Sequence, residues 1–587
     1  MYDLLNKIDG PNDLKKLNIS QLESLSDEVR EALFNRLTKI GGHFGPNFGV
    51  VELTIALHYV FNSPIDKFVF DVSHQSYTHK ILTGRKNGYI IDECFKEDSG
   101  YTNPEESKHD FFNVGHTSTS ISLATGLAKG RDLLGGKENI IAIIGDGSLS
   151  GGEALEGLNV AGSEVNSNLI IILNDNNQSI SEVHGGIYKN LELLRNTKGN
   201  ATSNMFKSFG LDYKYLENGN DIESLINVLK EIKDINHPIV LHINTQKGKG
   251  YKPAEENKEA WHWCMPFDRK TGKPLYDFSG EAYVDIAKNH LLSKAKKDSK
   301  VVVVTPNMPA AIGLNQDERK SLGFQFVDCG IAEEQAVAMA SGIAKRGAKP
   351  VVVTNATFMQ RTYDQVSHDV CINSTNVTFL INYANFDGLT DVTHLGIFSY
   401  SIFSNIPNLV IYSPSSKEEL LEVMDYAIDE ANHPTMILIP GDKVVSREIK
   451  EDIRNINKFE VSYKGSDVAI IALGDFYSKG LALYNKVKND LGINPTLINP
   501  RFASGIDKEL LDDLLKDHKL VITLEDGIKE GGFGYKISEY YSDKDIFVKV
   551  YGLEKVFYDR YNPDGLLKEL GMDTNSMVDY ISKFLNK

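Results

Sequence analysis

Short, continuous apolar runs rich in Val and Ile recur along the chain, separated by segments with helical periodicity. A strand that is apolar throughout is buried on both faces, which is typical of parallel sheets covered by helices. In residues 417–431, for example, the apolar side chains fall on one helical face behind a cap at Ser415 or Ser416. We therefore expect an α/β fold of doubly wound, mostly parallel sheets. The predicted strands are residues 139–144, 168–173, 238–244, 301–305, 350–354, 377–381, 409–412, 435–439, 468–473 and 520–524.

Two stretches without periodicity, residues 268–278 and 441–459, mark candidate domain boundaries. A chain of 587 residues is too long for one hydrophobic core. The sequence therefore predicts three α/β domains, over residues 1–270, 280–445 and 455–587.

The composition is that of an ordinary water-soluble protein, with 41% hydrophobic and 24% charged residues. No apolar run is long enough to cross a bilayer, and the first 17 residues lack the features of a secretory signal. We expect a cytoplasmic protein with no membrane partner. The net charge of −17 argues against nucleic acid but leaves small anionic substrates open. Four widely separated cysteines indicate scattered thiols rather than a zinc site or a disulfide framework: Cys94, Cys264, Cys329 and Cys371.

The strongest local signal is Gly145-Asp146-Gly147 at the end of one predicted strand, followed by an Asn-rich turn at the end of the next. Ligands of open α/β sheets bind at the carboxyl ends of strands. The Asp146 carboxylate, the Asn176 amide oxygen and the carbonyl of Gln178 are hard oxygen ligands of the kind that Mg²⁺ prefers. By itself the motif could also be a plain turn, since Asp-Gly is common in turns.

Further segments follow in a fixed order. They are residues 41–44 (GGHF), 49–54 (GVVELT), 71–85 (DVSHQSYTHKILTGR), 115–120 (GHTSTS), 247–251 (KGKGY), 331–333 (IAE), 357–361 (TFMQR), 363–365 (YDQ), 500–502 (PRF) and 531–534 (GGFG). Together with the Gly-Asp-Gly motif, they resemble the 1-deoxy-D-xylulose-5-phosphate synthase family over nearly the whole chain. Transketolases share the domain order, but they are not expected to carry the 71–85 segment.

The resemblance implies two cofactors, thiamine diphosphate and Mg²⁺. It implies that Glu333 hydrogen-bonds the aminopyrimidine ring and that Phe358 stacks on it. Proton transfer around the substrate falls to His43, His262 and His394, because the pKa of histidine lies near neutrality. The other implied cofactor contacts are His74, Gly115, His116, Thr117, Gly147, Ser148, Asn176, Lys247 and Tyr251. The implied partners are pyruvate, an aldehyde and a second copy of the chain.

The residues alone leave alternatives open. Glu333 could be a solvated glutamate at the start of a helix over residues 333–346, where an acid stabilises the helix dipole. Phe358 could be a core residue. Arg361 could hold a donor carboxylate, shape the pocket or form a surface salt bridge.

The sequence departs from the family at the positions expected to contact substrate. Tyr383 and Gly441 stand where the family has arginines, and Asn355 stands where it has a tyrosine. Neither Tyr nor Gly can replace a guanidinium, which binds phosphate through two parallel hydrogen bonds. Lys443, Arg447 or Arg501 could supply that charge from another direction.

Three functions follow as hypotheses. The first is a synthase that decarboxylates pyruvate and adds the two-carbon unit to glyceraldehyde 3-phosphate. The second is a related carboligase or transketolase-like enzyme with another donor or acceptor, which the missing arginines favour. The third is a catalytically silent homologue that keeps the cofactor, against which the retention of Glu333, His43 and His262 argues.

Overall fold

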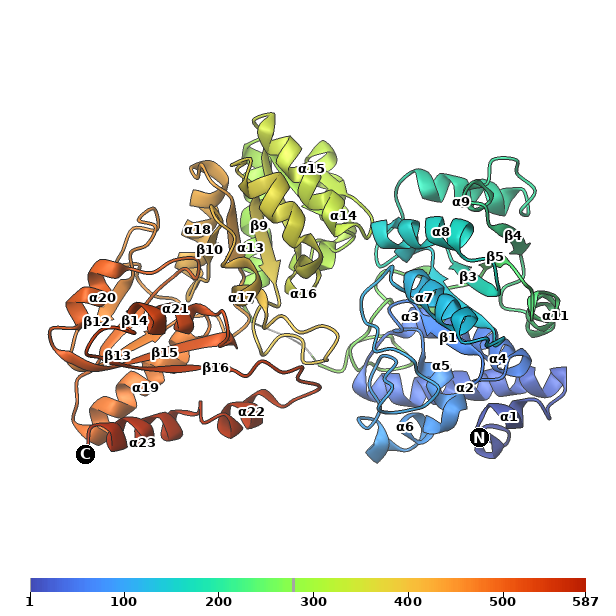
Figure 1. Ribbon diagram of the computed structural model, residues 1–587, viewed down its shortest axis with the longest axis horizontal. Coiled ribbons are helices and arrows are strands. Elements are labelled where there is room, and N and C mark those ends of the chain that lie inside the picture. The colour runs from blue at the N-terminus through green and yellow to red at the C-terminus, as the bar shows by residue number, and fades with distance from the viewer. Residues whose placement is uncertain (1, 277–279, 587) are drawn as a thin grey trace. The chain divides into compact units, whose positions relative to one another are not determined.

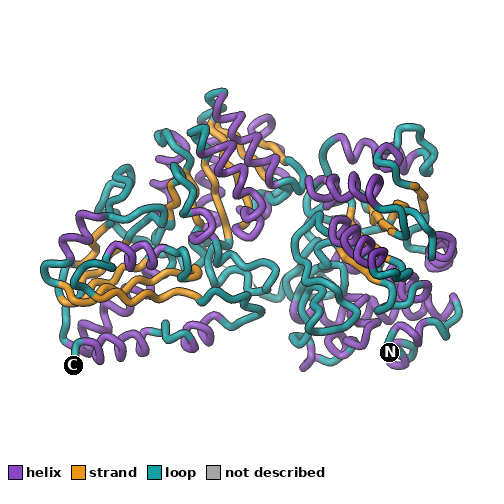
Figure 2. Tube along the Cα trace, viewed as in Figure 1, coloured by secondary structure: helices purple, strands orange, loops and turns teal. Residues whose placement is uncertain are grey.

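The computed structural model describes residues 2–276 and 280–586. They form two compact units (Figure 1): the first comprises the described residues up to 276 with residues 330–332, and the second comprises the rest. In each unit, strands lie between helices (Figure 2). The last part of the predicted boundary 268–278 lies outside the described residues.

The first unit is built on a five-stranded parallel sheet with strand order β1-β2-β3-β5-β4. β2, β3 and β5 confirm three of the predicted runs. β1 and β4 escaped prediction because β1 has only four residues and β4 is largely half-buried, with few continuous apolar residues. The strands are β1 (Lys67–Phe70), β2 (Ile140–Gly145), β3 (Leu169–Asp175), β4 (Asp212–Leu216) and β5 (Pro238–Asn244).

Both faces of this sheet are buried, as the continuous apolar runs predicted. Ile141 and Ile143 point into a core shared with α2, α4 and α11. Their neighbours Ala142 and Ile144 point into a second core shared with α7 and α8. The helices of the first unit are α1 (Pro11–Leu14), α2 (Ile19–Ile40), α3 (Phe44–Phe48), α4 (Val51–Val60), α5 (Tyr77–Lys80), α6 (Asn87–Ile90), α7 (Ser120–Leu133), α8 (Gly152–Glu164), α9 (Gly186–Asn196), α10 (Met205–Ser208), α11 (Ile222–Ile232) and α12 (Lys252–Glu256).

The second unit contains two sheets. The six-stranded sheet is parallel, with order β10-β11-β9-β8-β6-β7. Of its strands, only the three-residue β7 was not predicted. Its strands are β6 (Val301–Thr305), β7 (Phe326–Asp328), β8 (Lys349–Asn355), β9 (Thr378–Asn382), β10 (Val410–Tyr412) and β11 (Thr435–Leu438).

The other sheet has order β12-β14-β13-β15-β16, and only β12 runs antiparallel to its neighbour. The expectation of mostly parallel α/β sheets is therefore confirmed. β12, β14 and β16 were missed, since β12 and β14 are short and β16 mixes polar with apolar residues. The strands are β12 (Glu460–Tyr463), β13 (Asp467–Ala472), β14 (Thr496–Asn499), β15 (His518–Ile528) and β16 (Phe547–Leu553).

The predicted helix over residues 417–431 is α18, and its cap is Ser416, whose side chain accepts the N–H of Glu419. The helices of the second unit are α13 (Tyr283–Lys297), α14 (Gln316–Leu322), α15 (Glu333–Lys345), α16 (Ala356–Met359), α17 (Ser399–Phe403), α18 (Lys417–Asp429), α19 (Phe476–Leu491), α20 (Lys508–Leu514), α21 (Phe533–Tyr540), α22 (Pro563–Glu569) and α23 (Thr574–Phe584).

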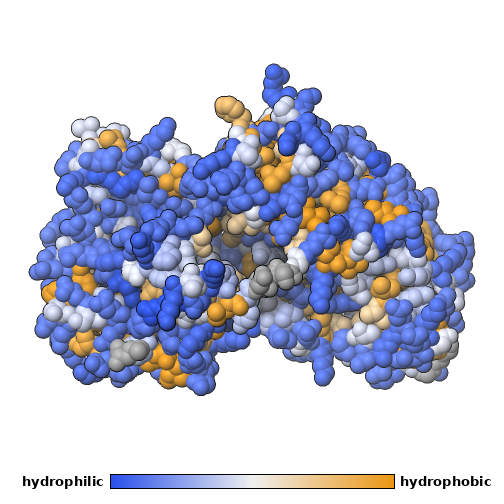
Figure 3. Space-filling view, turned by 180° about the vertical axis from the view of Figure 1, so that it is seen from behind, coloured by the Kyte–Doolittle hydropathy of each residue, from blue (hydrophilic) through white to orange (hydrophobic). Residues whose placement is uncertain are grey.

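The face of the molecule in Figure 3 is mostly hydrophilic, with hydrophobic side chains in small groups. Among the residues that the structure describes, no helix has both the length and the hydropathy that a bilayer-spanning segment requires.

Candidate active site

Three of the predicted histidines meet in the first unit. The ring centroids of His43 and His74 lie 5.0 Å apart, those of His74 and His262 lie 5.4 Å apart, and those of His43 and His262 lie 5.7 Å apart. Lys247, which follows β5, places its Nζ 3.1 Å from His262 Nδ1 and donates to the carbonyl oxygen of Ser179 at 2.6 Å. We call these four residues the histidine–lysine cluster.

Asn47, in α3, fixes two members of this cluster and was not singled out from the sequence. Its amide nitrogen donates to the carbonyl oxygens of His43 and His74, both at 2.7 Å. Its amide oxygen accepts the N–H of Tyr77 at 2.9 Å. The one available signal was an asparagine inside the apolar stretch of α3.

Close packing brings α3 onto Lys247. A Cβ at Gly45 would lie 3.2 Å from Cγ of Lys247 and 2.9 Å from the carbonyl oxygen of Trp261. Only glycine leaves room for both, so position 45 constrains the lysine stem.

Burial controls the charge of the cluster. It lowers the pKa of Lys247 to about 7, although Asp146 opposes the shift. Burial and then the charge of Lys247 hold the pKa of His262 well below its ordinary value. The cluster therefore offers a neutral imidazole beside an amine whose positive charge a bound anion would stabilise.

The predicted metal ligands lie together at the ends of β2 and β3. The buried Asp146 carboxylate accepts the N–H groups of Gly147 at 3.1 Å and Gln178 at 3.2 Å. The amide oxygen of Asn176 is buried and has no hydrogen-bond partner among the described residues. Burial and then the charge of Asp175 raise the pKa of Asp146 well above its ordinary value.

This arrangement fits a hard cation. An unpartnered amide oxygen beside a buried carboxylate is costly unless a ligand uses both. Within the described ranges, no group of three or more His, Cys, Asp or Glu residues is placed to hold a metal. A metal at the ends of β2 and β3 would therefore rely on amide and carbonyl oxygens as well as Asp146.

Asp175 supports this region and was also missed in the sequence. Its carboxylate is buried, bonded to His242 at 2.8 Å and paired with Arg195. Although burial opposes it, the bond from His242 lowers the pKa of Asp175. Asp175 therefore provides a fixed negative charge next to Asp146.

The 71–85 segment organises the loop that carries Gly115, His116 and Thr117. The Asp71 carboxylate accepts the N–H groups of Ser118 at 2.8 Å and Ser120 at 3.0 Å. These bonds fix the loop where α7 begins.

Ser148 and Tyr251, two other predicted cofactor contacts, lie in different surroundings. Ser148 lies in the turn after Gly147, and its carbonyl oxygen accepts the Ser118 hydroxyl at 2.8 Å. Tyr251 packs at 5.0 Å from the Trp261 ring, and its hydroxyl donates to the carbonyl oxygen of Arg269 at 3.1 Å. The structure thus places the Tyr251 side chain in an aromatic core rather than in the histidine–lysine cluster.

Glu333 is the first residue of α15 in the second unit and is only 3% exposed. The alternative of a solvated glutamate is therefore wrong. One carboxylate oxygen has no hydrogen-bond partner among the described residues and lies 3.5 Å from Arg361. Burial raises the pKa of Glu333, with Arg361 opposing. Arg361 pairs with a buried acid and does not form a surface salt bridge.

Phe358 and His394 form an edge contact, with ring centroids 5.8 Å apart. The Thr393 hydroxyl lies 2.8 Å from His394 Nδ1, and burial lowers the pKa of His394 to about 4. Phe358 is half-buried rather than fully in the core. Asn355 ends β8, and its buried amide oxygen is another without a hydrogen-bond partner in the described part of the chain.

The positions that lack the family arginines are occupied differently. Tyr383 has a φ of 54°, and its side chain is 39% exposed. A Cβ at Gly441 would lie 1.8 Å from the amide nitrogen of Asn385. That nitrogen and the N–H of Gly441 both donate to Asp475, at 3.0 and 2.9 Å. A side chain at position 441 therefore requires the Asn385 side chain to move away and give up its bond to Asp475.

Two of the three alternative cations are engaged elsewhere. Arg447 pairs with the buried Glu419 and Glu460. Arg501 is 1% exposed and donates to the backbone carbonyls of Glu451, Asp452, Asn455 and Lys458. Neither guanidinium is available to a substrate phosphate, whereas Lys443 is exposed.

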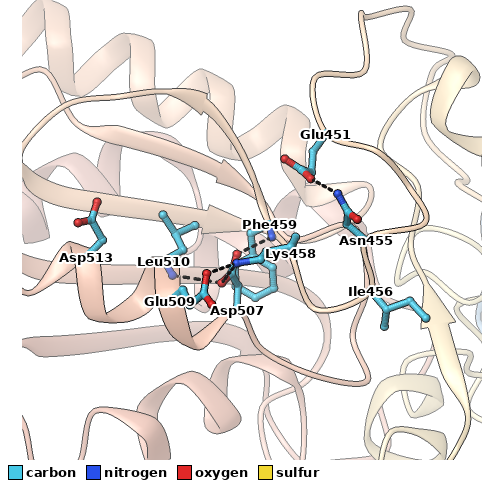
Figure 4. A pocket seen from close by; sticks show the side chains of 9 residues that line it. All are labelled: Glu451, Asn455, Ile456, Lys458, Phe459, Asp507, Glu509, Leu510 and Asp513. Carbon is cyan, nitrogen blue, oxygen red and sulfur yellow. Dashed lines mark hydrogen bonds and ion pairs between the residues drawn. The ribbon is translucent and has the colours of Figure 1, made fainter.

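The segment that Arg501 holds borders an open pocket of about 680 Å³. In Figure 4, Lys458 reaches Asp507 and Glu509, while Asp513 lies apart from them. The pocket is acidic and contains none of the predicted site residues, so it is separate from the candidate active site.

The electrostatics of the histidine–lysine cluster make a testable prediction. A titration of ¹³C-labelled histidine rings by NMR should show His262 neutral at about pH 6.5, where an ordinary histidine is half protonated. Lys247→Met should raise the pKa of His262, because it removes a nearby positive charge. The pKa should stay below about 6.5, because burial remains.

The control is Lys252→Met, which removes an 81% exposed side chain. It should leave the His262 titration unchanged. Protonation of His262 near pH 6.5 in the unmodified protein would contradict the burial argument.

Comparison with known proteins finds matches along most of the chain. The family model described as 1-deoxy-D-xylulose-5-phosphate synthase matches residues 5–202 and 195–245. The models for the transketolase pyrimidine binding domain and C-terminal domain match residues 281–444 and 457–577.

Curated relatives match along almost the full chain. The 1-deoxy-D-xylulose-5-phosphate synthase of Caldanaerobacter subterraneus subsp. tengcongensis is 38% identical over 98% of both chains. That of Alkaliphilus oremlandii is 38% identical over 99% of both chains. A solved transketolase from Campylobacter jejuni aligns with 97% of this chain and 100% of its own, at 18% identity and a TM-score of 0.45, which is too low a likeness to carry an argument.

Proposed function

This chain belongs to the 1-deoxy-D-xylulose-5-phosphate synthase family, and we propose that it is a thiamine-diphosphate-dependent transferase of that type. It decarboxylates pyruvate and joins the remaining two-carbon unit to glyceraldehyde 3-phosphate. The observation that carries this proposal is the buried carboxylate of Glu333, which has only a long contact of 3.5 Å to Arg361 at an oxygen that lacks a hydrogen bond among the described residues, so that this oxygen suits a hydrogen bond to a cofactor ring.

The first unit would hold the diphosphate. Lys247, buried and with a pKa near 7, gains its full charge when an anion binds beside it. Gly147 lets the backbone approach closely: a Cβ there would lie 2.5 Å from the Ser179 hydroxyl. His74, Gly115, His116, Thr117 and Ser148 would complete the contacts.

Mg²⁺ would bind to Asp146, Asn176 and the carbonyl of Gln178. The charge of the metal would favour ionised Asp146, which burial and Asp175 otherwise disfavour. The unpartnered oxygen of Asn176 supports this assignment.

The second unit would hold the pyrimidine. Bound thiamine diphosphate supplies the nucleophilic carbon that adds to a carbonyl and stores the electron pair after decarboxylation. Glu333 would hydrogen-bond the aminopyrimidine, and its raised pKa favours the protonated acid at that oxygen. Phe358 would stack on the ring. His43, together with His262 and His394, whose pKa values burial lowers, would accept or return protons at the substrate oxygen atoms.

We also propose that residues 1–270, 280–445 and 455–587 are separate domains, because each range contains one sheet. By the family resemblance the protein would act as a homodimer, with about twice the chain mass of 65.3 kDa in light scattering.

A second candidate function keeps this chemistry but uses an acceptor without a phosphate. It is favoured by Asn385, which fills the space at Gly441 where a family arginine would stand, and by the engagement of Arg447 and Arg501 elsewhere. Tyr383 and Asn355 would then contact an uncharged acceptor, and Arg361 would position Glu333.

Product analysis by NMR separates the two candidates. The protein, thiamine diphosphate, Mg²⁺ and ¹³C-labelled pyruvate are incubated with glyceraldehyde 3-phosphate or with glyceraldehyde. Formation of 1-deoxy-D-xylulose 5-phosphate at the higher kcat/KM supports the first candidate. Ligation chiefly to glyceraldehyde supports the second, and no turnover with either would contradict both.

Matched variants sharpen this test. If the second candidate is right, the double variant Asn385→Gly with Gly441→Arg should raise kcat/KM for the phosphorylated acceptor roughly ten- to hundredfold. This ratio corresponds to the free energy that a charge-assisted hydrogen bond contributes. Gly441→Arg alone should give no gain, because Asn385 occupies the space.

The metal assignment predicts that Asn176→Ala lowers the Mg²⁺ affinity of the thiamine-diphosphate complex by about tenfold or more. Calorimetric titration of Mg²⁺ measures this. The control is Asn177→Gly, which alters the adjacent residue and tolerates its φ of 55°. Equal Mg²⁺ affinity in Asn176→Ala and the unmodified protein would refute the assignment.

A further inference from the structure

A small cavity in the second unit is lined by none of the described residues assigned above to the cofactors. It has a volume of about 10 Å³ and is lined by residues that follow or end β9, β10, β11 and β13, together with Asp526 within β15 and Tyr400 of α17. Its polar lining residues are Asn385, Tyr400, Ser413, Asp475 and Asp526. The volume is on the order of that needed by one water molecule or one bare ion.

Two side-chain oxygen atoms at this cavity lack hydrogen-bond partners among the described residues. Asp526 is 2% exposed and Asn385 is 6% exposed, and one oxygen of each has no hydrogen-bond partner in the described residues. The amide nitrogen of Asn385 donates to Asp475, which fixes the orientation of its free oxygen. The hydroxyls of Tyr400 and Ser413 lie 2.8 Å apart.

The charges at the cavity are also unbalanced. Two aspartates line it, and no Lys, Arg or His does so among the residues described. Asp475 accepts hydrogen bonds from the N–H of Gly441 and the side-chain amide of Asn385, and both donors are neutral. Burying two carboxylates without a counter-charge is strongly unfavourable.

We propose that this cavity binds one hard divalent cation of the Ca²⁺ type. Two carboxylates balance a charge of +2, and the amide and hydroxyl oxygens add ligands that a hard cation accepts. The absence of His and Cys from the lining disfavours zinc. A water molecule would satisfy the free oxygens without supplying a counter-charge, so at least one of the two acids would have to stay protonated beside it. The site stabilises the packing of the two sheets of the second unit and does not depend on the proposed activity.

The test uses the full-length chain, stripped with EDTA and free of thiamine diphosphate. Asp146→Asn serves as the background, because it removes the predicted Mg²⁺ site. Tb³⁺ luminescence counts the bound ions, and thermal unfolding with and without Ca²⁺ measures stabilisation. We expect one Tb³⁺ per chain, displaced by Ca²⁺, and a rise of about 3 °C or more in the melting temperature at saturating Ca²⁺.

Two further substitutions define the site. Asp526→Asn should abolish both the Tb³⁺ signal and the Ca²⁺-dependent rise in melting temperature. Asp513→Asn is the control, because it neutralises an acid that lines the open pocket of Figure 4. It should alter neither the Tb³⁺ signal nor the Ca²⁺-dependent rise in melting temperature. Should Asp526→Asn fail to fold, Ser413→Ala provides a milder change and should weaken Tb³⁺ binding several-fold.

The proposal is overturned if the Asp146→Asn protein binds no Tb³⁺, or if Asp526→Asn or Ser413→Ala binds Tb³⁺ as tightly as that background. Stabilisation by K⁺ or Na⁺ but not by Ca²⁺ would overturn the assignment to a divalent ion.

Discussion

Burial of parallel strands on both faces is the constraint from which the rest of this structure follows. A strand enclosed by helices can expose polar groups only where it ends, so functional side chains collect at the carboxyl edges of the sheets. Asp146, Asn176 and Lys247 follow β2, β3 and β5 in this way. In the second unit, Asn355 ends β8 and Asp475 follows β13. The same rule thus accounts for the proposed cofactor site and for the proposed cation site.

The proposed cofactor region and the position of Gly441 differ in whether their buried polar atoms have hydrogen-bond partners. Asn176 and Asn355 each keep a buried oxygen without a hydrogen-bond partner among the described residues, at a cost of about 1–3 kcal/mol apiece, and Glu333 has only a 3.5 Å ion pair with Arg361 at one buried oxygen. Such a cost is expected where a ligand supplies the missing partner. At Gly441, by contrast, Asn385 fills the space and is bonded to Asp475. The proposed cofactor region thus leaves buried oxygen atoms available to ligands, whereas the Asn385 side chain fills the expected phosphate position.

Much of this could be predicted from the sequence, and the failures have physical causes. Continuous apolar runs revealed β2, β5 and β8, because burial on both faces leaves an unmistakable pattern. The pattern is absent in short or half-exposed strands such as β1 and β4. Motif spacing predicted that Asp146 and Asn176 lie at the ends of two strands, and the structure places them directly after β2 and β3.

Residues that act through other residues left no such pattern. Asn47 fixes His43 and His74 through backbone carbonyls, and such bonds depend on chain folding rather than on local sequence. The sequence allows Arg447 to be a phosphate ligand, whereas the structure pairs it with two buried carboxylates. Long-range pairing of this kind requires the tertiary structure.

The central claim is that the cofactor-activating part of the site is intact, whatever the acceptor. Hydrogen–deuterium exchange at C2 of protein-bound thiamine diphosphate, followed by quench and NMR, tests it without any substrate. We predict exchange far faster than in free thiamine diphosphate, and a loss of roughly 10²–10⁴-fold in Glu333→Gln, the range of general acid–base catalysis. Gln335→Ala, at an exposed position of the same helix, should exchange as fast as the unmodified protein. Slow exchange in the unmodified protein, or equally fast exchange in Glu333→Gln, would contradict the account.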